Sequence, residues 1–215
     1  MVRLLAVMIG YVFGLFPSAI ICGKLHHKDI TKEGSGNTGA TNVVRAMGAK
    51  AGFLVFLGDC LKCILAIVLV RSLFGESHED MIQLLCLYAG AGAILGHDFP
   101  FYKKFKGGKG ISATAGMVIA FDPLFALVGV VMFFSIYFLT FFVSLGSMMT
   151  YLFLLILLVI CGQLGYFPDM SQAALIEAYV LFALLTALAF WSHRSNIKRL
   201  RDGIERQTKL KNKVD

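Results

Sequence analysis

Residues 123–143 read PLFALVGVVMFFSIYFLTFFV, a run of 21 positions without one charged side chain. A helix needs about 20 predominantly apolar residues to cross the hydrocarbon core of a bilayer. Inside lipid every backbone polar group must be bonded within the protein, so a run of this kind is read as a helix. The run therefore predicts a transmembrane helix.

Six further apolar runs surround it, and 58% of the chain is hydrophobic, which excludes an ordinary soluble domain. We predict one all-α, polytopic membrane domain over residues 1–215 with seven spans, at about 4–22, 51–73, 81–97, 111–121, 123–143, 148–167 and 172–192. The fourth run is short, and only Asp122-Pro123 separates it from the fifth, so six spans are the alternative. The first run has no cleavage signature and is interpreted as a retained helix.

The basic residues predict the topology. Of the 20 lysines and arginines, 17 lie after the first, third and seventh runs. Cytoplasmic loops carry such an excess, which places these segments in the cytoplasm and the N-terminus outside. That arrangement requires an odd number of spans and favours seven. The end of the chain, residues 207–215, is predicted to be a frayed basic tail.

Five cysteines lie in or beside apolar runs, and only Cys60 and Cys63 have a metal-like spacing. With no second pair, they are interpreted as small packing residues. The polar segments contain no carboxylate cluster for a divalent cation. We therefore predict neither a metal site nor a cofactor.

The first polar segment reads GSGNTGATN at residues 34–42, and Arg45 follows it. Its glycines allow tight turns that expose backbone N–H groups, and Ser35, Asn37 and Thr38 add polar side chains. Such a segment can form an anion-binding nest with Arg45 as a charged clamp. No Lys-Ser or Lys-Thr closes it, so it is not a nucleotide P-loop; a flexible loop is the alternative.

The second polar segment reads FKGGKG at residues 105–110, just before the run at 111–121. The free N–H groups and positive dipole end of a helix N-terminus favour phosphate, and Lys106 and Lys109 would add charge there. The alternative is a basic segment on anionic lipid. The glycines argue against it, because lipid attraction needs no close backbone approach. His97 ends the preceding run and is interpreted as a helix cap.

The third polar segment reads HRSNIKRL at residues 193–200 and closes the last run. At helical spacing, His193, Asn196 and either Arg199 or Leu200 lie on one face. They are predicted to point together toward the other two polar segments. The alternative is a basic amphipathic helix on the membrane surface.

Asp59 and Lys62 are ionisable residues inside the run at 51–73, three positions apart and so on one helix face. A charge in the membrane costs about 2.5–3.5 kcal/mol on insertion scales, and local pairing is the common solution. We interpret them as a structural pair that supports the site; a direct functional role is the alternative.

The three segments together resemble the signature segments of the bacterial acyl-phosphate:glycerol-3-phosphate acyltransferases. The residues that carry this resemblance are GSGNTGATNVVRAMG at 34–48, the run from His97 through Pro100 to FKGGKG at 105–110, and HRSNIKRLRDGIE at 193–205. They occur in the family's order. The Asp59-x-x-Lys62 pair also resembles a family feature, although Cys63 stands where a glycine is usual, and residues 111–114 carry one extra residue.

The resemblance implies a seven-helix enzyme of the bacterial inner membrane with its active site on the cytoplasmic face. It would transfer a fatty acyl group from acyl phosphate to the 1-hydroxyl of glycerol 3-phosphate, the first acylation of phospholipid synthesis. Carried over by position, the substrate-binding residues would be Ser35, Asn37, Thr38, Arg45, Lys106, Gly107, Gly108, Lys109 and Asn196. His193 would be the candidate base, unless the substrate's own phosphate serves. The supporting residues would be Asp59, Lys62, His97 and Arg199.

An organic-phosphate transporter is the rival interpretation, because it also needs a basic site among helices. Transporters usually place that site near the bilayer midplane, often between repeated halves, whereas these polar segments cluster on one predicted side. Membrane lipids are expected partners. Nucleic acid is not, because no aromatic and basic platform accompanies the tail. The residues leave the oligomeric state open.

Overall fold

The computed structural model describes residues 1–208, which form helices and no strand. Most of the predicted tail, residues 209–215, lies outside the described residues. The α-helices are α1 (Val2–Gly14), α2 (Ser18–Leu25), α3 (Ala40–Met47), α4 (Ala49–Phe74), α5 (Ile82–Asp98), α6 (Ile111–Phe121), α7 (Pro123–Thr140), α8 (Val143–Gln163), α9 (Gln172–Ser192) and α10 (Arg194–Arg201). Two short 3-10 helices, η1 (Glu79–Met81) and η2 (Phe101–Lys103), flank α5. The all-helical prediction is confirmed.

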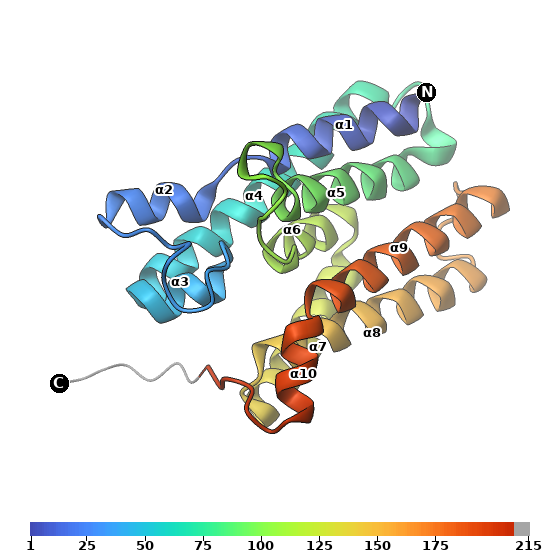
Figure 1. Cartoon of the computed structure of the whole chain (residues 1–215). Helices are drawn as coiled ribbons and strands as arrows, with labels where there is room; N and C mark the ends of the chain where they lie inside the picture. The colour runs from blue at the N-terminus through green and yellow to red at the C-terminus, as the bar shows by residue number, and fades with distance from the viewer. Residues whose placement is uncertain (209–215) are drawn as a thin grey trace.

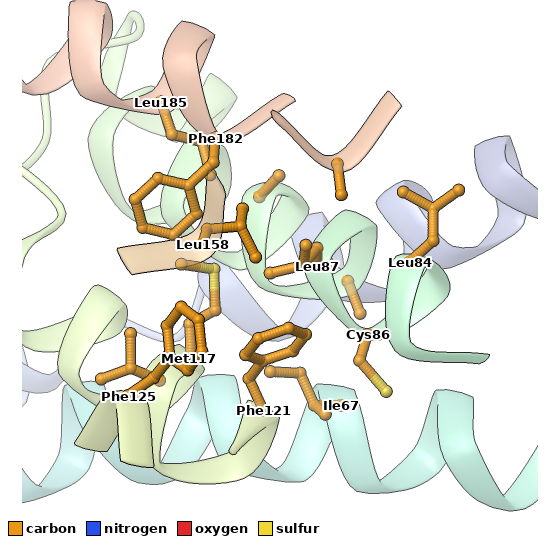
Figure 2. Packing of buried hydrophobic residues seen from close by; sticks show 14 of the residues in the cluster. Ile67, Leu84, Cys86, Leu87, Met117, Phe121, Phe125, Leu158, Phe182 and Leu185 are labelled. Carbon is orange, nitrogen blue, oxygen red and sulfur yellow. The ribbon is translucent and has the colours of Figure 1, made fainter. Parts of the chain in front are cut away.

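The helices form two groups with α6 between them (Figure 1). Helices α1, α4 and α5 pack together in one group, α7, α8 and α9 in the other, and α6 contacts both. One apolar core joins the groups. It includes one large side chain from each of the helices from α4 to α9 (Figure 2): Ile67, Leu87, Met117, Phe125, Leu158 and Phe182.

Among the described residues, six segments are long and apolar enough to cross a membrane. They are Val2–Leu25, Ala49–Phe74, Glu79–Lys103, Pro123–Thr140, Val143–Gln163 and Gln172–Ser192. The predicted span at 111–121 is a helix with those bounds, but its 11 residues measure about 16 Å at 1.5 Å per residue. That is about half of the ~30 Å hydrocarbon core.

Helix α6 packs beside only the second half of α4. Near its start, Cys60 Sγ donates a hydrogen bond of 3.0 Å to the Ser112 carbonyl. Near its end, Arg71 Nη2 lies 3.4 Å from the Ala120 carbonyl. The segment before α6 therefore reaches in from the α3 end of the bundle to about the level of Cys60, near the middle of α4.

Three predicted spans have clearly different bounds in the structure. The run at 4–22 is broken between α1 and α2, where Pro17 cannot donate a backbone hydrogen bond. The run at 123–143 ends at Thr140, and Phe141 turns the chain with a φ of 57°. Helix α8 accordingly begins at Val143 instead of residue 148. No glycine or proline marks the turn at Phe141. The run of apolar residues continues across it, so the predicted helix extended past its observed end.

Glycines fix α1 against α5. A Cβ at Gly10 or Gly14 would overlap backbone atoms of α5, and a Cβ at Gly92 or Gly96 would overlap backbone atoms of α1. Small residues four apart let membrane helices approach to backbone contact. This contact fixes the end of α5, from which His97 projects.

Candidate active site

The three polar segments meet at one cavity of about 460 Å³. Its lining includes polar side chains from each segment and from the chain just after α10: Ser35, Asn37, Arg45, Lys109, His193, Asn196, Arg199 and Glu205. Residues that are up to 170 positions apart in the sequence thus share one site. The predicted convergence of the three segments is confirmed.

The rest of the cavity wall is apolar. Phe53 and Phe56 of α4 line it on one side, and Phe133, Phe134 and Tyr137 of α7 line it on the other. Phe53 is 58% exposed and Phe134 is 44% exposed, so this wall adjoins the outer, apolar surface of the bundle. The cavity therefore joins a polar end to an apolar side that borders lipid.

The first segment is organised by Asn42, which the sequence analysis did not single out. Its Oδ1 accepts a hydrogen bond of 2.9 Å from the Ser35 backbone N–H. Its Nδ2 donates to the carbonyls of Ile30 and Glu33 at 3.3 and 3.0 Å. The amide thereby holds the glycine-rich turn closed and places Ser35 at the cavity. Asn42 belongs to the quoted segment, but its position in the turn could not be predicted from spacing.

The two central glycines of the second segment differ from their predicted role. The N–H of Gly107 donates to the Asp98 carbonyl at 2.9 Å, and that of Gly108 donates to the His97 carbonyl at 3.1 Å. Both N–H groups are therefore already used and are not free to cradle a phosphate. A Cβ at either glycine would overlap atoms of His97. Their lack of a side chain lets the segment pack onto the end of α5.

The two lysines of this segment lie in different places. Lys109 is half-buried and lines the cavity. Lys106 is exposed and lies outside the cavity lining. Sequence spacing treats them alike, whereas the structure favours Lys109 as the cation that meets a ligand.

His193 lies where α9 ends and α10 begins, so its ring is fixed by two helices. Its Nδ1 donates a hydrogen bond of 2.8 Å to the Ala189 carbonyl. Burial, together with the positive charge of Lys109, lowers the pKa of His193 to about 4. The ring is therefore neutral at pH 7, with Nδ1 protonated and Nε2 free to accept a hydrogen bond.

Asn196 connects the second and third segments. Its Oδ1 accepts a hydrogen bond from Lys109 Nζ, and its Nδ2 donates to Glu205 Oε1 at 2.6 Å. Glu205 Oε1 also accepts from the Ser144 hydroxyl at 2.9 Å, and Oε2 accepts from Arg199 Nε at 2.6 Å. The chain of contacts fixes the amide orientation of Asn196 between a cation and a carboxylate.

Glu205 is a site residue that the sequence analysis missed. Burial acts to raise its pKa, but the hydrogen bonds from Asn196, Arg199 and Ser144 hold the pKa of Glu205 below its ordinary value. The helical-face argument ended at Leu200, whereas the chain reverses at Gly203, which has a φ of 69°. The signal was present, because the stretch at 193–205 that carries the family resemblance ends in this glutamate.

The chain after α10, residues 203–208, forms a strap across the cavity. Tyr137 donates a hydrogen bond of 2.6 Å to the Thr208 carbonyl, and the Thr208 N–H donates to the Phe141 carbonyl at 3.0 Å. Arg45 Nη2 donates to Thr208 Oγ1 at 2.8 Å and to the Arg206 carbonyl at 3.3 Å. The strap therefore joins α3 to α7.

The predicted Asp59–Lys62 pair is confirmed, with 2.8 Å between Oδ1 and Nζ. The sequence suggested that His97 caps α5, but its side chain does not do so. Its ring turns inward, and Nδ1 lies 2.9 Å from Lys62 Nζ.

A second cavity of about 20 Å³ is lined by Asp59, Lys62, His97 and Thr38. Thr38 is absent from the lining of the main cavity. Among the described residues, no cluster of three metal-ligating side chains occurs.

Comparison with known proteins decides the family. The family model described as "Glycerol-3-phosphate acyltransferase" matches residues 4–203. The chain belongs to this family. The predicted resemblance is thereby confirmed as far as the family is concerned. The chain is a membrane acyltransferase of glycerol 3-phosphate.

Relatives match over nearly their whole length. The chain is 40% identical to the glycerol-3-phosphate acyltransferase of Bacillus velezensis over 197 residues, which cover 91% of this chain and 92% of that one. The enzyme of Bacillus subtilis is 38% identical over 208 residues, with 95% and 97% covered. The crystal structure of PlsY, an integral membrane glycerol 3-phosphate acyltransferase in its glycerol 3-phosphate form, superposes with a TM-score of 0.82 at 31% identity, covering 96% of each chain.

Proposed function

We propose that this acyltransferase uses acyl phosphate as its donor and acylates the 1-hydroxyl of glycerol 3-phosphate, which releases lysophosphatidic acid and inorganic phosphate. The observation that supports this most is the mixed character of the main cavity. Arg45 and Lys109 suit phosphate groups at the polar end. The apolar wall between α4 and α7 suits an acyl chain that enters from the bilayer.

The reaction needs positioning more than it needs a strong protein base. The hydroxyl oxygen attacks the acyl carbonyl carbon, the bond from that carbon to the phosphate oxygen breaks, and the phosphate leaves with the bonding electrons. Acyl phosphate is a mixed anhydride with a good leaving group. The protein must chiefly bring two anions together and offset their repulsion, which is proximity and electrostatic catalysis.

We assign His193 the role of orienting the attacking hydroxyl. Its Nε2 is an acceptor that can take a hydrogen bond from that hydroxyl. A ring whose pKa is lowered to about 4 is a weaker base than a phosphate whose second pKa is about 6. His193 therefore orients the hydroxyl through this hydrogen bond before attack, and the proton released as the new C–O bond forms ends on a phosphate oxygen of a bound substrate, which is the stronger base.

We further propose that the N-terminus lies outside and that the cavity opens to the cytoplasm of a bacterial cell. Met1 and α10 lie at opposite ends of the bundle (Figure 1), and the polar segments gather at the α10 end. In the sequence, 17 of the 20 basic residues follow the first, third and seventh apolar runs, and the positive-inside rule assigns such segments to the cytoplasm. Reporters fused to the two ends should read opposite sides of the membrane; reporters on the same side would refute this topology.

The function is tested with purified protein in detergent, labelled glycerol 3-phosphate and acyl phosphate. We expect lipid-soluble label and inorganic phosphate to form in equal amounts. Label that stays water-soluble in the presence of folded protein would reject the proposal. A transporter would instead accumulate unmodified glycerol 3-phosphate inside sealed vesicles, so the two functions leave the label in different molecules.

A further inference from the structure

Lys62 has a hydrogen-bond acceptor for each of its three N–H groups. Its Nζ lies 2.8 Å from Asp59 Oδ1, 3.1 Å from the Phe16 carbonyl and 2.9 Å from His97 Nδ1. The side chains of Lys62 and Asp59 are only 4% and 1% exposed, so the ammonium depends on these partners. An ammonium has three donors and no acceptor. All three donors are accounted for.

This arrangement fixes the tautomer of His97. Because the ammonium can only donate, Nδ1 of His97 must be the unprotonated acceptor, and the neutral ring then carries its hydrogen on Nε2. The opposite tautomer would aim Nδ1–H at Asp59 Oδ1, which lies 3.5 Å away. That distance exceeds the usual range of 2.7–3.2 Å, and the hydrogen would crowd the ammonium.

His97 is also part of the wall of the main cavity. Its Nε2 lies against Gly108, where a Cβ would overlap the ring. Within residues 1–208, Nε2 has no hydrogen-bond partner. It is also not one of the side-chain polar atoms that are fully buried without a partner. The cavity wall therefore includes a residue whose uncharged N–H donor has no partner within residues 1–208, and the absence of a side chain at position 108 leaves room for the ring.

We propose that His97 is a substrate-binding donor whose Nε2–H binds an anionic phosphate oxygen, and that Lys62 and Asp59 are positioning residues that fix its tautomer. This inference rests on the proposed function and names a further contact in the same site. The two cavity histidines then have opposite tautomers. His193 offers an acceptor to the hydroxyl, and His97 offers a donor to a phosphate.

Two isosteric variants test the contact. In His97→Gln the amide nitrogen takes the place of Nε2 and keeps the donor, whereas in His97→Asn the amide oxygen takes the place of Nδ1, which keeps the acceptor for Lys62 and removes the donor. Losing a hydrogen bond to a charged group lowers kcat/KM by at least about tenfold. We expect His97→Gln to stay within about fivefold of the parent protein in KM, and His97→Asn to raise the KM of one phosphorylated substrate by more than tenfold.

A rise in the KM for glycerol 3-phosphate would show that His97 binds the phosphate of that substrate. A rise in the KM for acyl phosphate would show that it binds the phosphate of the donor. Equal losses in both variants at an unchanged thermal midpoint, or a greater loss in His97→Gln, would overturn the proposal. If His97→Asn does not fold, the spectroscopic measurement below decides.

Nitrogen-15 NMR of histidine-labelled protein in micelles reads the tautomer without any need for turnover, and His97→Gln assigns the signal. We expect a protonated Nε2 and an unprotonated Nδ1 at pH 7.5, and a shift of the Nε2 signal when glycerol 3-phosphate or inorganic phosphate is added. In Lys62→Met the Nδ1 signal should move toward that of a protonated nitrogen. A protonated Nδ1 in the parent protein would overturn the inference. Failure of acyl phosphate as donor would instead refute the proposed function and leave this readout intact.

Discussion

Arg45 and Thr208 lie 163 positions apart, yet the guanidinium of Arg45 donates a hydrogen bond of 2.8 Å to the Thr208 hydroxyl. The same nitrogen, Nη2, also donates to the Arg206 carbonyl. A guanidinium has five N–H donors in a rigid fork. The strap therefore holds one end of the fork, and within residues 1–208 Nε and Nη1 have no partner and can meet a ligand in the cavity.

The first prediction follows from this shared guanidinium. Arg45→Ala should lower kcat/KM for glycerol 3-phosphate by roughly tenfold to a hundredfold, because a charge-assisted hydrogen bond contributes about 1.5–3 kcal/mol. Arg45→Lys should recover little, since an ammonium cannot reproduce the planar, bidentate fork of a guanidinium. Steady-state kinetics on folded protein measure both. Recovery to within about twofold in Arg45→Lys would contradict the bridging role.

The second prediction separates the two lysines of the second segment. Lys109→Ala should lower kcat/KM by at least about tenfold, because the variant loses a cation that faces the cavity. Lys106→Ala removes the same charge from an exposed position outside the lining and should stay within about threefold. The two variants are matched in chemistry, so each controls for the other. A greater loss in Lys106→Ala would move the phosphate site away from the main cavity.

The third prediction concerns Asn196, which accepts from Lys109 and donates to Glu205. Asn196→Asp places a second carboxylate beside Glu205, and two carboxylates that share a site repel each other. We expect a lower thermal midpoint at pH 8 and partial recovery toward pH 5, because protonation of one carboxylate relieves the repulsion. Asn196→Ala, which adds no charge, should show no such recovery. A midpoint of Asn196→Asp that does not depend on pH would argue against this contact.

The fourth prediction is a pH profile. Burial, reinforced by the positive charge of Arg199, lowers the pKa of Lys109 to about 8. The cation is therefore present below that pH and is lost as the pH rises through it. We expect kcat/KM for glycerol 3-phosphate to fall above about pH 8. Lys109→Arg should remove the fall, since arginine stays charged. An unchanged fall in Lys109→Arg would assign the ionisation to another group.

The long helices could be predicted from the sequence, because apolar length is a strong signal for a membrane span. The bounds of α6 were predicted correctly, but its short length follows from the depth at which the second segment enters the bundle. The break at Pro17 could have been expected from proline chemistry. The turn at Phe141 could not, because an aromatic residue at positive φ follows from tertiary packing.

The candidate site could be predicted as three segments but not as contacts. Order and charge placement indicated that the segments would meet. They could not show that Gly107 and Gly108 serve packing, that Lys106 faces outward, or that His97 turns toward Lys62, because each depends on the close fit of α5 against its neighbours. Glu205 was missed because the chain reverses after α10 and returns it to the cavity.

We propose that this family member takes its acyl group from acyl phosphate, and a comparison of donors measures this choice. Purified protein would be given labelled glycerol 3-phosphate with either acyl phosphate or an acyl thioester of the same chain length, with Arg45→Ala as the control of lowered activity. We expect labelled lysophosphatidic acid with acyl phosphate, no product with the thioester, and no loss of rate when a metal chelator is added. Sustained turnover with the thioester as the sole donor would contradict it.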